Sequence, residues 1–164
     1  MGTEKGRERK RRVISSLLHN SNYYVLLTSF YQSVLPIFKS YVMVFQSETP
    51  IIHKVYLQQI SIVKKFLSYF VKPEDLAKCK KGKHFLKLDL KNSLLPKDLL
   101  FVGFKAKKLI QKLGTNDKDV VKFLEKVEQS YLKCGEYVQT KLPLENAFLK
   151  AVSAIDPLLI TECA

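Results

Sequence analysis

Apolar residues return every three or four positions along much of this chain, which is the period of one face of an α-helix. The period is clearest between residues 23 and 45, where Pro36 interrupts it. We expect this proline to kink or split the helix near Gln32, whose carbonyl would lose its hydrogen-bond partner. The apolar positions of this segment are Val25, Leu26, Phe30, Val34, Ile37, Phe38, Tyr41 and Phe45.

The same period predicts two further long helices. One starts at Pro50 and stops at Val71-Lys72-Pro73, because the residue before a proline avoids the helical region. Its apolar face holds Ile52, Val55, Gln59, Ile62, Val63, Phe66 and Phe70. The other follows the capping sequence Thr115-Asn116-Asp117 and runs to about Lys141. Its apolar face holds Val120, Val121, Phe123, Leu124, Val127, Tyr131, Leu132, Cys134 and Val138.

Shorter segments complete a predicted all-α fold. We expect helical turns at 13–19 and from Pro73, and helices at 105–113 and 145–154. Residues 80–96 are the least regular part and are compatible with a short extended segment. The sequence therefore predicts an irregular bundle of about five to seven helices with short loops, forming a single domain over 13–164.

The first twelve residues are strongly basic, and we expect them to be a disordered tail. They contain all four arginines of the chain, and every later cation is a lysine. Such a segment is typical of a nuclear localisation signal or a phosphate-binding tail, so we expect a nuclear protein, or otherwise a cytoplasmic one. The candidate nucleic-acid-binding residues are Lys5, Arg7, Arg9, Lys10, Arg11 and Arg12.

A body with lysine alone argues against sequence-specific reading of DNA, because arginine is the side chain that matches two guanine acceptors at once. Non-specific attraction to phosphates remains open. The competing interpretation is that these lysines only solvate the outer faces of helices.

Residue types that carry catalysis do not form a recognisable pattern. His19, His53 and His84 are scattered, and none has a second ligand at a metal-site spacing. The three cysteines, Cys79, Cys134 and Cys163, are odd in number and far apart, which favours reduced thiols. No phosphate-binding loop or nucleophile motif is present. We therefore predict no enzymatic activity, no cofactor and no metal.

The stretch FQSETPIIHKVY, residues 45–56, resembles a chemical site but is better explained as a corner between two helices. Thr49 can cap the second helix and Pro50 can occupy its first turn, so these two residues form a predicted structural hinge. His53 then has a partly buried structural place and needs no chemical role.

The aromatic residues between positions 23 and 45 are expected to pack in a core or against another protein, since only one lysine accompanies them. We therefore expect self-association, or a protein partner bound through exposed apolar helix faces, and non-specific nucleic acid as a further partner. No apolar run is long enough for a membrane span.

An ordered set of segments resembles hAT-superfamily transposase-like proteins. The set begins with Phe45, Gln46, Ser47 and Pro50, and continues with Phe70, Val71, Lys72 and Pro73. It then includes 86–90, 94–110 and 141–157, which closes with Asp156-Pro157. The resemblance covers roughly residues 25–160 and points to the helical insertion of a ribonuclease-H-like transposase.

This resemblance implies a non-catalytic fragment, because the metal-binding acids of such transposases lie on strands outside the insertion. It also implies at most a protein- or DNA-binding role in the nucleus. The alternative is an independent helical adaptor whose basic tail binds nucleic acid or an acidic membrane surface.

Overall fold

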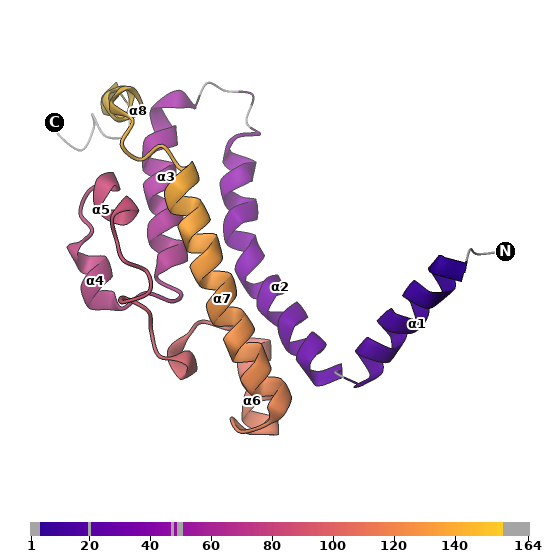
Figure 1. Cartoon of the computed structure of the whole chain (residues 1–164). Helices are drawn as coiled ribbons and strands as arrows, with labels where there is room; N and C mark the ends of the chain where they lie inside the picture. The colour runs from indigo at the N-terminus through magenta and orange to yellow at the C-terminus, as the bar shows by residue number, and fades with distance from the viewer. Residues whose placement is uncertain (1–3, 20, 47, 49–50, 156–164) are drawn as a thin grey trace. The chain divides into compact units, whose positions relative to one another are not determined.

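The computed structural model describes residues 4–19, 21–46, 48 and 51–155. Within these ranges the chain forms eight α-helices and two short 3₁₀ helices, and no strand (Figure 1). The all-α prediction is confirmed, and the helix count slightly exceeds the expected five to seven. The helices are α1 (Glu4–His19), α2 (Ser21–Val44), α3 (Ile52–Leu67), α4 (Pro73–Lys78), α5 (Gly82–Leu86), α6 (Phe104–Leu113), α7 (Lys118–Lys141) and α8 (Ala147–Val152), with 3₁₀ helices η1 (Lys97–Leu99) and η2 (Ser153–Ile155).

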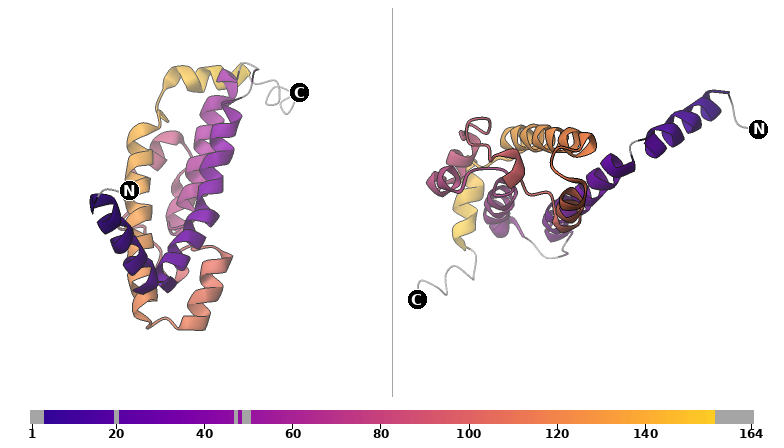
Figure 2. Two further views of the ribbon diagram at one scale, coloured as in Figure 1. Left: turned by 90° about the vertical axis from the view of Figure 1, so that its right-hand side faces the viewer. Right: turned by 90° about the horizontal axis from the view of Figure 1, so that it is seen from below.

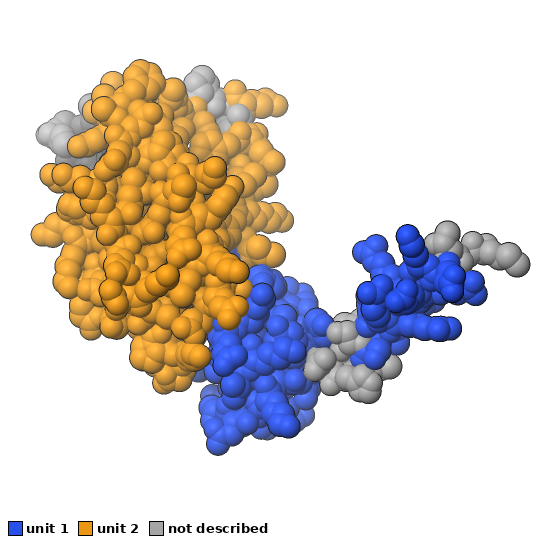
Figure 3. All heavy atoms as spheres, viewed as in Figure 1, with its two compact units in different colours: residues 1–34, 102–127 blue, residues 35–101, 128–164 orange. Residues whose placement is uncertain are grey.

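The chain divides into two compact units (Figure 3). Unit 1 comprises residues 1–34 and 102–127, and unit 2 comprises 35–101 and 128–164. The two long helices α2 and α7 each contribute residues to both units. The expectation of one domain over 13–164 stays a prediction.

The core of unit 1 comes from α2, α6 and the first half of α7. The rings of Phe30 and Phe123 meet edge to face, with their centroids 6.2 Å apart. The main-chain amide of Tyr23 donates to Asp119 at 3.3 Å and links the start of α2 to α7. The buried apolar residues are Tyr23, Leu26, Phe30, Val34, Val102, Ala106, Val120, Phe123 and Val127.

The core of unit 2 is built around aromatic residues of α3, of the turn that follows it and of α7. Tyr131 stacks on Phe70 with ring centroids 4.8 Å apart, and Phe66 contacts both rings. The short α8 and η2 pack against α3, and Figure 2 shows α8 lying crosswise to it. The side-chain amide of Gln139 holds the less regular segment at residues 80–96. Its Nε2 donates to the main-chain carbonyls of Phe85 and Leu88, at 2.8 and 2.9 Å.

Residues 45–51 separate two helices, as expected of a corner. Helix α2 ends at Val44, but α3 starts at Ile52, two residues later than the predicted start at Pro50, and Ile51 occupies the N-cap position without a side-chain cap. The predicted hinge residues Thr49 and Pro50 lie outside the described residues.

Two local expectations differ from the structure in part. Of the two outcomes expected at Pro36, the split is wrong, because α2 continues through this residue as one helix. The extended contact in the 80–96 region is an isolated antiparallel bridge between Val71 and Leu94, whereas residues 82–86 are helical. Two main-chain hydrogen bonds hold the bridge. The amide of Lys72 donates to the carbonyl of Ser93, and the amide of Leu95 donates to the carbonyl of Phe70, both at 2.8 Å.

The basic tail also differs from its prediction. Residues 4–12 are not disordered in this structure but form the first turns of α1. Most of these residues have good helix propensity, and no proline interrupts them. Glu4 lies in the first turn, where an acid is favourable, and Glu8 lies 3.7 Å from Arg12 one turn further on.

Candidate functional site

All six candidate nucleic-acid-binding residues lie on α1, and all are exposed. Helical spacing distributes them around the helix instead of on one side. Arg7 and Arg11 are one turn apart, while Lys5, Arg9 and Arg12 form a second row. The helix therefore presents cationic groups in several directions, each able to contact a phosphate.

The cationic excess is concentrated in unit 1. That unit carries thirteen Lys and Arg against five Asp and Glu, while the larger unit 2 carries fifteen against ten. Helix α6 adds four exposed lysines, Lys105, Lys107, Lys108 and Lys112, and begins with Phe104, which is 80% exposed. The sequence showed these lysines, but only the structure assigns them to the same unit as α1.

The histidines and cysteines have local structural settings. His84 accepts a hydrogen bond at Nδ1 from the main-chain amide of Lys80 at 3.2 Å, which closes a turn. His53 is partly buried on α3, as predicted, and the side chain of His19 lies outside the description. Cys79 and Cys134 are free thiols, and burial raises the pKa of both, which disfavours the reactive thiolate.

Acidic residues likewise serve local structure. Asp75 pairs with Lys78 at 2.7 Å, and hydrogen bonding from Lys78 and then from Ser93 lowers the pKa of this partly exposed carboxyl. Asp117 caps α7 by accepting from the amides of Asp119 and Val120. Among the residues described, no three His, Cys, Asp or Glu side chains gather where they could hold a metal ion.

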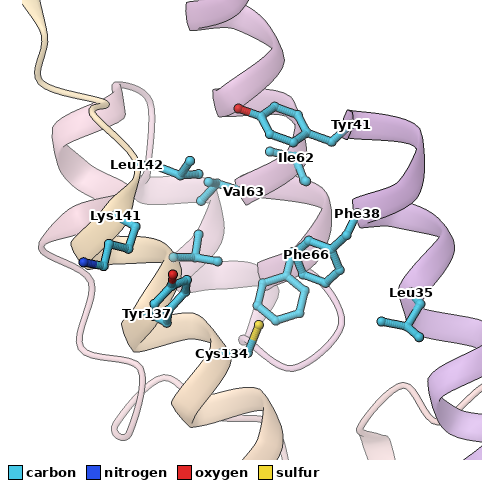
Figure 4. Close-up of a pocket in the computed structure, with 11 residues that line it drawn as sticks. Leu35, Phe38, Tyr41, Ile62, Val63, Phe66, Cys134, Tyr137, Lys141 and Leu142 are labelled. Atoms are coloured by element: carbon cyan, nitrogen blue, oxygen red, sulfur yellow. The ribbon is translucent and has the colours of Figure 1, made fainter. Parts of the chain in front are cut away.

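A pocket of about 370 Å³ opens in unit 2 between three helices (Figure 4). Side chains from the second half of α2 face side chains from the end of α7, and α3 forms the floor between them. The lining residues are Leu35, Phe38, Tyr41, Ile62, Val63, Phe66, Cys134, Tyr137, Val138, Lys141 and Leu142.

Few polar groups accompany this apolar lining. Burial raises the pKa of Tyr41, and the neighbouring Gln59 side chain opposes the rise. Gln59 is 6% exposed, and its Oε1 has no hydrogen-bond partner in the described structure. Lys141 is the single charged lining residue, and its Nζ lies 5.9 Å from the centre of the Tyr137 ring.

Sequence reasoning did not predict this pocket. Most of its lining residues belong to the predicted apolar faces of the three long helices, and such a pattern cannot show whether the faces close completely. The only signal was an unusual density of aromatic residues between positions 23 and 45.

Comparisons with protein-family models, curated proteins and solved structures found no match to this chain. In the part of the chain that is described, no helix has the length and apolar content needed to cross a membrane. The support for the two candidate sites, the cationic helix α1 and the pocket in unit 2, therefore comes from the geometry and charge of this chain's own residues.

Proposed function

We propose that this chain is a non-catalytic helical protein that binds nucleic-acid phosphates through α1. The observation that carries the proposal is the placement of six exposed cations, including all four arginines, on one helix. Each phosphate contact releases condensed counterions, so such a helix gains affinity without reading a base sequence. The cationic excess of unit 1 supports the same conclusion.

The charge arrangement favours nucleic acid over an acidic membrane surface. A helix that lies on a membrane needs an apolar face opposite its cations. The cations of α1 instead surround the helix through residue 12, and its apolar residues come later, starting with Val13 and Ile14. Binding to anionic lipid vesicles without binding to duplex DNA would contradict this choice.

The test is a salt titration of binding to a labelled duplex of mixed sequence, followed by fluorescence anisotropy. We expect the slope of log affinity against log salt to fall by about 0.9 for each phosphate contact removed. Changing the six α1 cations to glutamine should therefore remove most of the affinity and flatten the slope.

The matched control changes the same number of exposed lysines in unit 2: Lys64, Lys65, Lys80, Lys81, Lys87 and Lys91. The net charge of the control equals that of the α1 variant. Equal losses in the two variants would show that only total charge matters, and the assignment to α1 would fail.

The resemblance to hAT-superfamily transposases gives this proposal a context. We propose that the chain corresponds to the helical insertion of such a protein, without the metal-binding acids. Coding sequence for acidic strands on both sides of this segment in its gene would support that origin. Divalent-metal-dependent nicking of DNA by the purified chain, abolished by changing one of its acids, would overturn the non-catalytic assignment.

A nuclear location is part of the same proposal, because α1 has the composition of a nuclear localisation signal. A fluorescent fusion should concentrate in the nucleus and become diffuse when the six α1 cations are replaced. An unchanged distribution would contradict it.

A further inference from the structure

Helix α6 places an aromatic ring in solvent among cationic side chains. Phe104 is 80% exposed, more than any other large apolar side chain in the described part of the chain. Lys107 and Lys108 follow it by three and four residues, so all three side chains lie on one side of the helix. Lys112 extends this side by one further turn, and Lys105 lies next to Phe104 in sequence. We call these five residues the α6 face.

The opposite side of α6 packs within unit 1. Its buried or half-buried residues are Ala106, Leu109, Ile110 and Leu113. The backbone at Gly103, just before the helix, lies so close to α2 that a Cβ there would overlap Ser33. Because α6 is held on its apolar side, the α6 face is presented to solvent from a fixed position in this unit.

The charge of the α6 face is uniformly positive. The sequence of α6, FKAKKLIQKL, contains four lysines and no acid. Within the residues that the structure describes, none of these lysines lies within ion-pairing distance of an Asp or Glu. The face is therefore complementary in charge to a polyanion.

The exposed ring decides which polyanion fits best. A single exposed apolar residue needs no explanation by itself. Cations combined with an exposed ring, however, are what single-strand-binding surfaces use, because the cations follow the phosphates and the ring stacks on a base. The bases of a duplex are stacked on one another, so only an unpaired strand can offer a base to Phe104. A membrane surface would require a broad apolar face in place of one ring.

We propose that the α6 face binds single-stranded nucleic acid, with one base stacked on the Phe104 ring and the neighbouring phosphates at Lys107, Lys108 and Lys112. Helix α6 is about 15 Å long, so the site spans only a few nucleotides. This site goes beyond phosphate binding by α1, which accepts a duplex. The two sites share no residue and can fail separately.

The first experiment measures binding of the full-length chain to three labelled probes by fluorescence anisotropy. The probes are oligothymidine of about twelve nucleotides, an abasic strand of the same length, and a duplex of the same length. We expect Phe104→Ala to weaken oligothymidine binding by about ten-fold, the size of one lost stacking contact, and to leave the other two probes unchanged. Phe148→Ala is the matched control, because Phe148 is 63% exposed on α8 in unit 2 and should change none of the three affinities.

Two further variants separate stacking from general apolar contact. Phe104→Trp keeps a ring that can stack, so it should bind oligothymidine at least as well as the unchanged protein. Phe104→Leu keeps an apolar side chain without a π face, so it should behave like Phe104→Ala. Circular dichroism should show that all variants remain folded, since the ring is mostly in solvent.

The lysines of the face are tested with the salt dependence. Replacing Lys107 and Lys108 together by glutamine should weaken binding to both single-stranded probes and reduce the salt slope by about 1.4, or about 0.7 for each contact. Lys64 and Lys65, an exposed adjacent pair on α3, provide the matched control.

The variant that lacks the six α1 cations keeps this test separate from the proposed role of α1. It should lower the affinity for all three probes but preserve the ratio of oligothymidine to abasic affinity, because that ratio depends on Phe104. If α1 binds no phosphate, the ratio still reports the α6 face.

Three results would overturn the proposal. Equal affinities of the unchanged protein for oligothymidine and the abasic strand would exclude base stacking. Full oligothymidine affinity in Phe104→Leu would replace stacking by a simple apolar contact. Binding to phosphatidylserine vesicles that Phe104→Ala weakens, with oligothymidine binding unchanged, would assign the α6 face to a membrane surface.

Discussion

The hydroxyl of Tyr131 donates a 2.6 Å hydrogen bond to the main-chain carbonyl of Phe101 and so ties α7 to the segment that follows η1. Phe101 is also held from the other side, because its amide donates to the carbonyl of Tyr69 at 2.9 Å and the two rings stack with centroids 4.3 Å apart. Phe101, which lies outside any helix, is thereby fixed by Tyr131 on α7 and by Tyr69 in the turn that follows α3.

Replacing this tyrosine should therefore weaken unit 2 without emptying its core. Tyr131→Phe keeps the ring that stacks on Phe70 and removes only the hydroxyl. We expect a loss of about 1 kcal/mol in the free energy of unfolding, measured by urea denaturation at neutral pH. A change near zero would mean that water replaces the hydroxyl at the Phe101 carbonyl.

Because of the same hydroxyl, we expect the free energy of unfolding to fall in alkali. Burial raises the pKa of Tyr131 well above its ordinary value of 10.0, so the unfolded chain loses this proton first as the pH rises. The stabilising contribution is complete below the unfolded pKa and is lost as the pH rises above about 10. When the pH is raised from 10 to 11, the free energy of unfolding should fall in both proteins. The fall should be about 1 kcal/mol smaller in Tyr131→Phe than in the unchanged protein, because the variant lacks this titrating group. Parallel stability curves for the two proteins would contradict this.

Gly103 is predicted to be the least replaceable glycine of unit 1. Its φ of 83° lies in the left-handed region, and a Cβ built there would overlap the Oγ and Cβ atoms of Ser33. Gly103→Ala should lower the free energy of unfolding by about 3 kcal/mol, because backbone strain and steric overlap add together.

Gly114 provides the control for that substitution. Its φ of 91° is similar, but a Cβ there would meet nothing within 4 Å. Gly114→Ala should lower the free energy of unfolding by only about 1 kcal/mol, because it adds backbone strain without steric overlap. Equal losses at the two positions in urea denaturation would show that the contact with Ser33 has no energetic weight.

Gln139 should stabilise the short segment between α5 and η1. Gln139→Met keeps the length of the side chain but leaves the carbonyls of Phe85 and Leu88 without this donor, at an expected cost of about 2 kcal/mol. Hydrogen exchange should accelerate in residues 82–90, where the anchor is lost. Gln111→Met, at an exposed site on α6, should change stability by less than about 0.5 kcal/mol and serves as the control.

Several elements were predictable because their signals are local. Asp117 precedes the helix that it caps, and Gly114 ends α6 with a positive φ that favours glycine. Pro73 begins α4, with Glu74 and Asp75 in its first turn. Each signal acts within a few residues, so no tertiary contact is needed to interpret it.

Helical period does not fix how deeply each apolar side chain is buried. Val25, Ile52 and Val121 belong to the predicted apolar faces and are about half exposed. Each lies near the edge of its apolar stripe, where the position of a neighbouring helix decides burial. Pro36 was compatible with a split helix, but α2 continues through it.

The sequence by itself determined the all-α class, most helix ends and the placement of every arginine before residue 13, since propensity, capping and charge are properties of short segments. Only the tertiary structure decided which helices share a unit and where their apolar faces leave a pocket. Those outcomes depend on contacts between residues far apart in the chain, such as Phe38 on α2, Val63 on α3 and Val138 on α7 at the pocket. Such contacts follow from three-dimensional packing, and no local pattern specifies them.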